Sequence, residues 1–162
     1  MKTILEIYYL RLVLNRVRYQ RKEVNVSRKG SDPDRVIWSL IRQNQHGASE
    51  EAEEHQFVIH STSWRYERPR KVVLTYIAYS DELTFEKGNW KSLSLKQLGQ
   101  VNKKSRKPPS RAALEKKVVS HAMRHIAFLI KTDDGIDFKT AMRPETMEAF
   151  ENLWVSLAGR IF

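Results

Sequence analysis

Polar side chains of chemically useful types gather in one apolar stretch, "FVIHSTSWRY" at 57–66. Histidine can act as a general acid or base, a hydroxyl can hold a phosphate oxygen, and an arginine fork suits phosphate or carboxylate. The sequence therefore predicts that any reactive or anion-binding site includes this stretch. Its polar residues are His60, Ser61, Thr62, Ser63 and Arg65.

A second polar group lies in segment 110–132, whose apolar periodicity predicts a long helix. His121 and His125 are four residues apart, so they are neighbours on the surface of that helix. Helical stepping places His125 within the apolar arc, His121 at its edge and Arg124 on the polar side. If this helix packs on the first stretch, His60 meets both histidines.

Three histidines that converge could bind a metal ion. Catalytic zinc uses three protein ligands, and two of them are often histidines one helical turn apart. Ala122, however, stands where the zinc-protease helix motif carries Glu. The chain has no cysteine, so any metal would depend on His and carboxylate ligands. The sequence predicts no cofactor, and a metal at His60, His121 and His125 is the less favoured interpretation.

Binding of an anionic ligand requires a less precise placement of side chains than metal binding or catalysis does. The triplet at 60–62, "HST", resembles half of the paired His-x-Thr/Ser signature of two-histidine phosphoesterases, but no second triplet follows. The favoured hypothesis is a pocket for an anionic or phosphate-bearing ligand, and whether it is an enzyme stays open. Its candidate residues are His60, Thr62, Arg65, His121, Arg124 and His125.

The same residues have a second explanation that needs no ligand. Buried His, Ser and Thr side chains often satisfy one another, and such networks fix how a helix packs on a sheet. The sequence leaves this structural role open beside the ligand pocket.

Positive charge suggests an alternative function. Lys and Arg number 29 against 19 Asp and Glu, a formal net charge of +10 that favours an anionic partner. Aromatic and basic residues also interleave in "SWRYERPRK" at 63–71, which suits base stacking and phosphate neutralisation. The alternative is a nucleic-acid-associated or protein-interaction module. Its contact residues are Arg68, Arg70, Lys71, Lys103, Lys104, Arg106 and Lys107.

Strand alternation divides the first stretch into two faces. One face is predicted to hold Val58, His60, Thr62, Trp64 and Tyr66, and the other Ser61, Ser63 and Arg65. Trp64 and Tyr66 are therefore expected in the core, and only the arginines at the hairpin tip remain exposed.

The remaining elements are predicted from periodicity and capping signals. Strands over 56–66 and 71–80 form a hairpin, and both are apolar on both parities, as inner strands are. A short helix follows Ser31 or Asp32 with Pro33 at its first position. The last helix starts near Pro144 and buries a stripe of apolar residues. That stripe is Met147, Phe150, Trp154 and Leu157.

The N-terminal segment 2–22 is ambiguous between helix and strand. Ile7, Leu10, Leu14 and Val17 recur at helical spacing, although its Ile, Tyr and Val content also suits a strand. We predict a helix, so that region 1–43 would contain two helices.

Together these elements predict one α+β domain over 1–162. A small antiparallel sheet, led by the hairpin 56–80, packs against the helix 110–132 and the C-terminal helix, and 103–109 is a flexible basic loop. The apolar runs are far shorter than the about 18 residues of a membrane span. With no secretory signal in the first residues, the predicted location is the cytoplasm. The oligomeric state stays open.

Three motifs together resemble a set of small uncharacterised bacterial proteins. These are the "HSTSWR" strand, the "VLTY" strand and the helix "HAMRHIAFL", which span most of 57–130. The resemblance implies that the polar residues of strand and helix form one unit, but it implies no mechanism. That unit is His60, Arg65, His121, Arg124 and His125.

Overall fold

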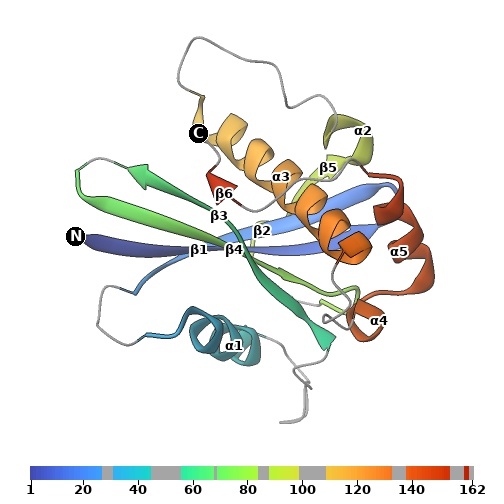
Figure 1. The fold of residues 1–162 in the computed structure, drawn as a ribbon, viewed down its shortest axis with the longest axis horizontal. Coiled ribbons are helices and arrows are strands. Elements are labelled where there is room, and N and C mark those ends of the chain that lie inside the picture. The colour runs from blue at the N-terminus through green and yellow to red at the C-terminus, as the bar shows by residue number, and fades with distance from the viewer. Residues whose placement is uncertain are drawn as a thin grey trace.

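A mixed sheet of six strands forms the centre of the molecule, in the order β5-β2-β1-β4-β3-β6 (Figure 1). The computed structural model describes residues 1–26, 31–44, 56–67, 69–83, 88–98, 109–132, 138–153 and 159–160. The strands are β1 (Lys2–Val13), β2 (Arg16–Asn25), β3 (Val58–Glu67), β4 (Lys71–Tyr79), β5 (Lys91–Ser94) and β6 (Gly159–Arg160). The helices are α1 (Pro33–Asn44), α2 (Leu95–Leu98), α3 (Arg111–Thr132), α4 (Phe138–Ala141) and α5 (Pro144–Glu151). The predicted α+β class is confirmed.

The strand directions correct the prediction of a small antiparallel sheet. β3 and β4 form the predicted antiparallel hairpin, and β2 pairs antiparallel with both β1 and β5. β1, however, runs parallel to β4 in the centre of the sheet. The sheet is therefore larger than predicted, and it is mixed.

The N-terminal segment is a β-hairpin, so the predicted helix over 2–22 is wrong. Leu14 has a φ of 55° and forms with Asn15 the two-residue turn that joins β1 to β2. In β1, every residue from Ile4 to Leu10 is buried, because sheet neighbours flank the strand and helices cover both faces. In a strand that is buried on both faces, apolar residues stand at almost every position, so some of them fall at helical spacing by necessity. The β-branched and aromatic residues of this segment favour the strand.

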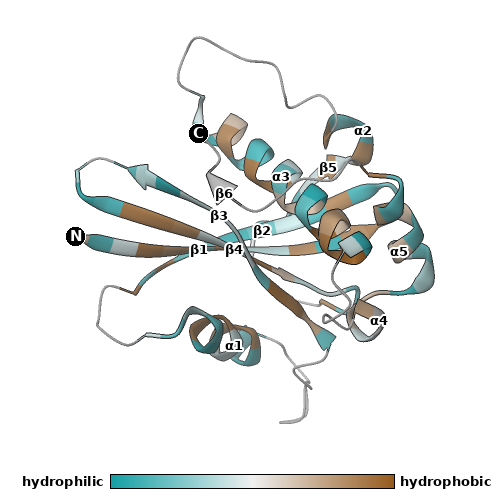
Figure 2. Ribbon diagram, in the orientation of Figure 1, coloured by the Kyte–Doolittle hydropathy of each residue, from teal (hydrophilic) through white to brown (hydrophobic). Residues whose placement is uncertain are grey.

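Two apolar cores lie on opposite faces of this sheet (Figure 2). On one face, α1 buries Ile37 and Ile41 against Leu5, Ile7 and other sheet residues. On the other face, α3 and the smaller helices pack on the strands. That larger core includes Tyr8, Leu10, Ile77, Tyr79, Ala122 and Ile126.

The predicted helix boundaries are confirmed at α1, at α3 and at the start of α5. Asp32 caps α1 by accepting a hydrogen bond from the backbone of Asp34 at 3.0 Å. Ser110 caps α3 by accepting one from Ala113 at 3.2 Å. α5 begins at Pro144 but ends at Glu151, and the predicted stripe residues Trp154 and Leu157 lie outside the described residues.

A β-bulge at Thr62 changes the facing of the second half of β3. Ser61 pairs with Tyr76 and Ser63 with Thr75, so Thr62 is one extra residue opposite β4. After the bulge, Ser63 and Arg65 join His60 on the α3 face, and Trp64 and Tyr66 turn to the α1 face. The predicted division of this stretch is therefore wrong beyond Thr62.

Candidate functional site

The three histidines come together where α3 crosses β3. His125 Nε2 lies 3.2 Å from His60 Nδ1, and the two ring centroids are 5.0 Å apart. The rings of His121 and His125 are nearly parallel, at 9°, with centroids 6.4 Å apart. His125 is only 2% exposed, whereas His60 and His121 are half-buried. Of the predicted contacts between His60 and the helix, the one with His125 is present, and His121 lies beside His125.

Backbone carbonyls fix where the protons of this cluster sit. His121 Nε2 donates to the carbonyl of Thr62 at 3.1 Å, because a carbonyl can only accept. His60 Nδ1 lies 2.8 Å from the carbonyl of Ser61 and therefore carries its proton there. That assignment leaves His125 Nε2 as the acceptor from His60. Each of these ring nitrogens is thus used within the protein, and the bulge carbonyl anchors α3.

The electrostatics at His121 favour its neutral ring. Burial lowers the pKa of His121, the nearby Arg124 lowers it further, and the hydrogen bond to Thr62 opposes both. Arg124 itself donates from Nη2 to Ser120 Oγ at 3.1 Å. Among the residues that the structure describes, no group of three or more His, Cys, Asp or Glu is placed to hold a metal ion. The arrangement suits helix packing on the bulge.

Arg65 belongs to a separate ionic network on the same face. Its guanidinium grips Glu6 in two hydrogen bonds of 2.6 and 2.9 Å, and both side chains are almost fully buried. Arg21 Nε donates to Glu6 Oε2 at 2.7 Å from the other side, and Thr75 Oγ1 donates to Oε1 at 3.1 Å. Arg65 Nε also donates to Glu67 at 2.9 Å. Two carboxylates therefore occupy the fork that the sequence offered to a ligand.

The charge state of Glu6 follows from these partners. Burial alone would raise its pKa, but the hydrogen bonds and charge of Arg65, with those of Arg21, outweigh burial and lower it. Sequence analysis missed both Glu6 and Arg21, because their segment was predicted to be a helix. The available signal was a lone carboxylate within an apolar run, which in a buried strand must find a cation.

Two large aromatic side chains are exposed on the opposite face of β3. Trp64 is 39% and Tyr66 64% exposed, and their rings meet edge to face at 87° with centroids 5.5 Å apart. The prediction that both belong to the core is wrong, because the bulge reverses their facing. In the described part of the chain, the exposed large apolar side chains are these two, Met1 and Leu14.

Basic residues lie at the same end of the sheet as this aromatic pair, and strand alternation places Lys2 and Lys71 on the α3 face. Lys2 lies opposite Lys71 in the β1–β4 register, and its backbone N–H donates to the carbonyl of Arg70 at 2.8 Å. Lys71 pairs with Glu67, but the side chains of Lys2 and Arg70 make no ion pair within the described ranges. In Figure 1, this end of the strands extends past α1. The other predicted contact residues, Arg68, Lys103, Lys104, Arg106 and Lys107, lie outside the described residues.

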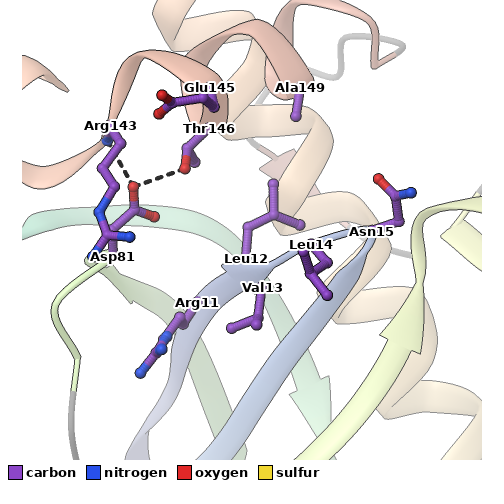
Figure 3. Close-up of a pocket in the computed structure, with 10 residues that line it drawn as sticks. All are labelled: Arg11, Leu12, Val13, Leu14, Asn15, Asp81, Arg143, Glu145, Thr146 and Ala149. Carbon is purple, nitrogen blue, oxygen red and sulfur yellow. Dashed lines mark hydrogen bonds between the residues drawn. The ribbon is translucent and has the colours of Figure 1, made fainter.

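A cleft of about 470 Å³ lies between the β1–β2 turn and the start of α5 (Figure 3). Asp81 dominates it, because its carboxylate accepts from the backbone N–H of Arg143 at 2.6 Å, Thr146 Oγ1 at 2.7 Å and Tyr79 Oη at 2.7 Å. Arg143, the residue before α5, provides no side-chain cap, and the bonds of Asp81 hold Arg143 and Thr146 to the end of β4. This carboxylate thus ties α5 to the sheet.

Comparison with known proteins adds no functional information. No family model matches the chain, and neither the curated proteins nor the solved structures give a match. The described helices include none that combines the length and the apolar character required to cross a membrane. Function must therefore be argued from the residues and their geometry.

Proposed function

We propose that this protein binds single-stranded nucleic acid through the aromatic face, defined as Trp64 and Tyr66 with Arg70 at the tip of their hairpin. One observation carries the proposal: the bulge exposes two adjacent rings on a hairpin whose tip holds a cation, Arg70, that has no ion pair in the described chain. Base stacking on such rings contributes about 1–3 kcal/mol per base. Lys and Arg add attraction to phosphates.

A single strand fits this face better than a duplex does. The bases of a duplex are stacked on one another, so their faces are covered, whereas those of a single strand can stack on an exposed ring. The formal net charge of +10 supports attraction to the backbone over the whole molecule.

The pocket hypothesis at the histidines has less support. His60 Nδ1, His121 Nε2 and the guanidinium of Arg65 already meet partners inside the protein, and a ligand at these atoms would have to displace those hydrogen bonds. Losing such bonds without replacement costs about 1–3 kcal/mol each. The ring of Tyr66, in contrast, is 64% exposed, so a base can reach it from the solvent.

The test is fluorescence anisotropy with a labelled single-stranded 12-mer of mixed sequence. Trp64→Thr and Tyr66→Thr remove the rings and keep the β-propensity of the strand. Each substitution is expected to weaken binding about 5- to 150-fold, the equivalent of about 1–3 kcal/mol per base. Leu14→Asn is the control, because it removes an exposed apolar side chain in the β1–β2 turn and Asn tolerates the positive φ there.

Two outcomes would sink the proposal. One is that the unmodified protein does not bind the 12-mer at low salt. The other is that the two ring variants bind as tightly as Leu14→Asn. Exposed aromatic and Arg residues also suit protein contacts. Capture of a protein partner that survives without nucleic acid, and that both ring variants abolish, would favour the protein-interaction alternative instead.

A further inference from the structure

A second cleft, of about 540 Å³, opens on the other side of the sheet from the aromatic face. It lies between β2, β5 and the first turn of α3. The residues that line it are Gln20, Arg21, Asn89, Lys91, Arg111, Ala112 and Glu115. Its volume is within the about 300–1,000 Å³ that small-molecule sites typically have.

The lining of this cleft carries surplus positive charge. Arg21, Lys91 and Arg111 line the cleft with one carboxylate, Glu115, which is almost fully buried and already pairs with Lys91. Glu6 and Glu23, outside the lining, pair with Arg21. Arg111 is exposed and makes no ion pair among the residues described. The positive end of the α3 dipole adds to the charge of Arg111, so the cleft offers an anion a positive end.

Arg21 gives the cleft a rigid donor. Its Nε and Nη2 are held by Glu6 and Glu23, which fixes the guanidinium at the base of the cleft with 14% of the side chain exposed. Its Nη1 makes no hydrogen bond within the described part of the chain. A guanidinium fixed in this way loses little conformational entropy when it binds a ligand.

We infer that this cleft binds a phosphate-bearing small molecule. Cations from three elements and the carboxamide side chains of Gln20 and Asn89 can donate to a ligand from several sides. Such an arrangement suits a phosphate dianion, because a single carboxylate is already satisfied by one arginine. The site is independent of the aromatic face, because β1 and β4 separate β2 from β3 in the sheet. A phosphate of a nucleic acid has the same chemistry as that of a free ligand, so the experiment must separate the two.

The probe is inorganic pyrophosphate, titrated by calorimetry at constant ionic strength. Arg111→Gln removes one cation of the cleft, and Lys116→Gln is the matched control on the exposed side of the same helix. Arg111→Gln is expected to weaken binding about tenfold, as the loss of one charge-assisted hydrogen bond does. Lys116→Gln is expected to bind as the unmodified protein does.

Ala112→Glu is the more decisive variant. It places a carboxylate in the cleft, yet an acidic residue in the first turn of a helix is favourable, so the fold is retained. We expect it to abolish pyrophosphate binding without lowering the melting temperature. No saturable binding by the unmodified protein, or undiminished binding by both Ala112→Glu and Arg111→Gln, would overturn the inference.

The two sites are distinguished by crossing the variants. Trp64→Thr is expected to retain pyrophosphate binding, whereas Ala112→Glu is expected to retain binding of the 12-mer. If Ala112→Glu abolishes both, the cleft contacts nucleic acid phosphates and is not a separate small-molecule site. Failure of 12-mer binding with intact pyrophosphate binding would remove the proposed function alone.

Discussion

The two faces of β3 differ in residue type and in exposure: one carries hydrogen-bonded polar side chains, and the other carries exposed aromatic rings. On the α3 face lie His60 and Arg65, and the protein itself occupies His60 Nδ1 and the guanidinium of Arg65. On the α1 face lie the aromatic side chains of Trp64 and Tyr66, which are exposed. The comparison teaches that residue type suggests a site, whereas the state of its atoms decides whether a ligand can use it.

One inserted residue accounts for this separation. If Thr62 were paired with β4 in place of forming a bulge, simple alternation along β3 would place Trp64 and Tyr66 on the face of His60 and Arg65 on the other face. The bulge therefore keeps Arg65 on the α3 face and the two rings on the α1 face. The contrast between the faces can therefore be tested at the ion pair, at the bulge, at the histidines and at the exposed cations.

Breaking the buried ion pair should have the largest effect on stability. Arg65→Met leaves Glu6 buried with only part of its compensation, and such a loss costs about 3–5 kcal/mol of unfolding free energy. Denaturant titration measures it. Glu82→Gln is the control, because its pair with Arg143 is exposed on both sides and should contribute about 0–1 kcal/mol. Equal losses for the two variants would contradict the assignment of Arg65 to the core.

The network around Arg65 also shows what sequence analysis could reach. The β3–β4 hairpin, α1 and α3 were predictable because their caps, turns and periodicity are local signals. The approach of His60 to His125 followed from the same signals. The partnership of Glu6 with Arg65 did not, because it depends on β1 being a strand that runs parallel to β4.

The face on which Trp64 and Tyr66 lie could not be predicted from the sequence, for a different reason. A bulge leaves no clear local mark, and this one is held by a contact far away in the chain, from His121 to the carbonyl of Thr62. Strand parity is a reliable guide only until an extra residue is inserted, after which every later prediction is reversed.

Deleting Thr62 should cost less than breaking the ion pair. Ser61 and Ser63 would then follow one another opposite Tyr76 and Thr75, so the pairing and the facing of the later residues are retained. The loss is the acceptor for His121, about 1–3 kcal/mol for a donor left without a partner. Denaturant titration and 12-mer binding together test this. Loss of binding with intact folding would show that the bulge shapes the aromatic face directly.

Acidification should affect the histidine side more than the aromatic side. The pKa of His121 is lowered by burial, so between its folded and unfolded values the unfolded chain binds more protons. The contribution of His121 to stability is thus complete above the unfolded pKa near 6.5. It is lost as the pH falls from that value through the lower pKa of the folded state. Melting temperatures from pH 8 to pH 5 should decline, and less steeply in His121→Gln. An identical decline in both proteins would exclude His121 as the cause.

Salt should have the smallest effect on the buried network and a measurable one on the aromatic face. Exposed charges are screened at high ionic strength, whereas the bonds between Glu6 and Arg65 are removed from solvent. In the proposed complex, each cation that neutralises a phosphate contributes about 0.7 to the slope of log affinity against log salt for a single strand. Arg70→Gln should therefore reduce that slope by about 0.7 if one phosphate contact is lost. Lys96→Gln, at an exposed position of α2, should leave it unchanged. Equal slopes for the two variants would mean that Arg70 attracts nucleic acid only through the net charge, and Arg70 would lose its assigned role in the aromatic face.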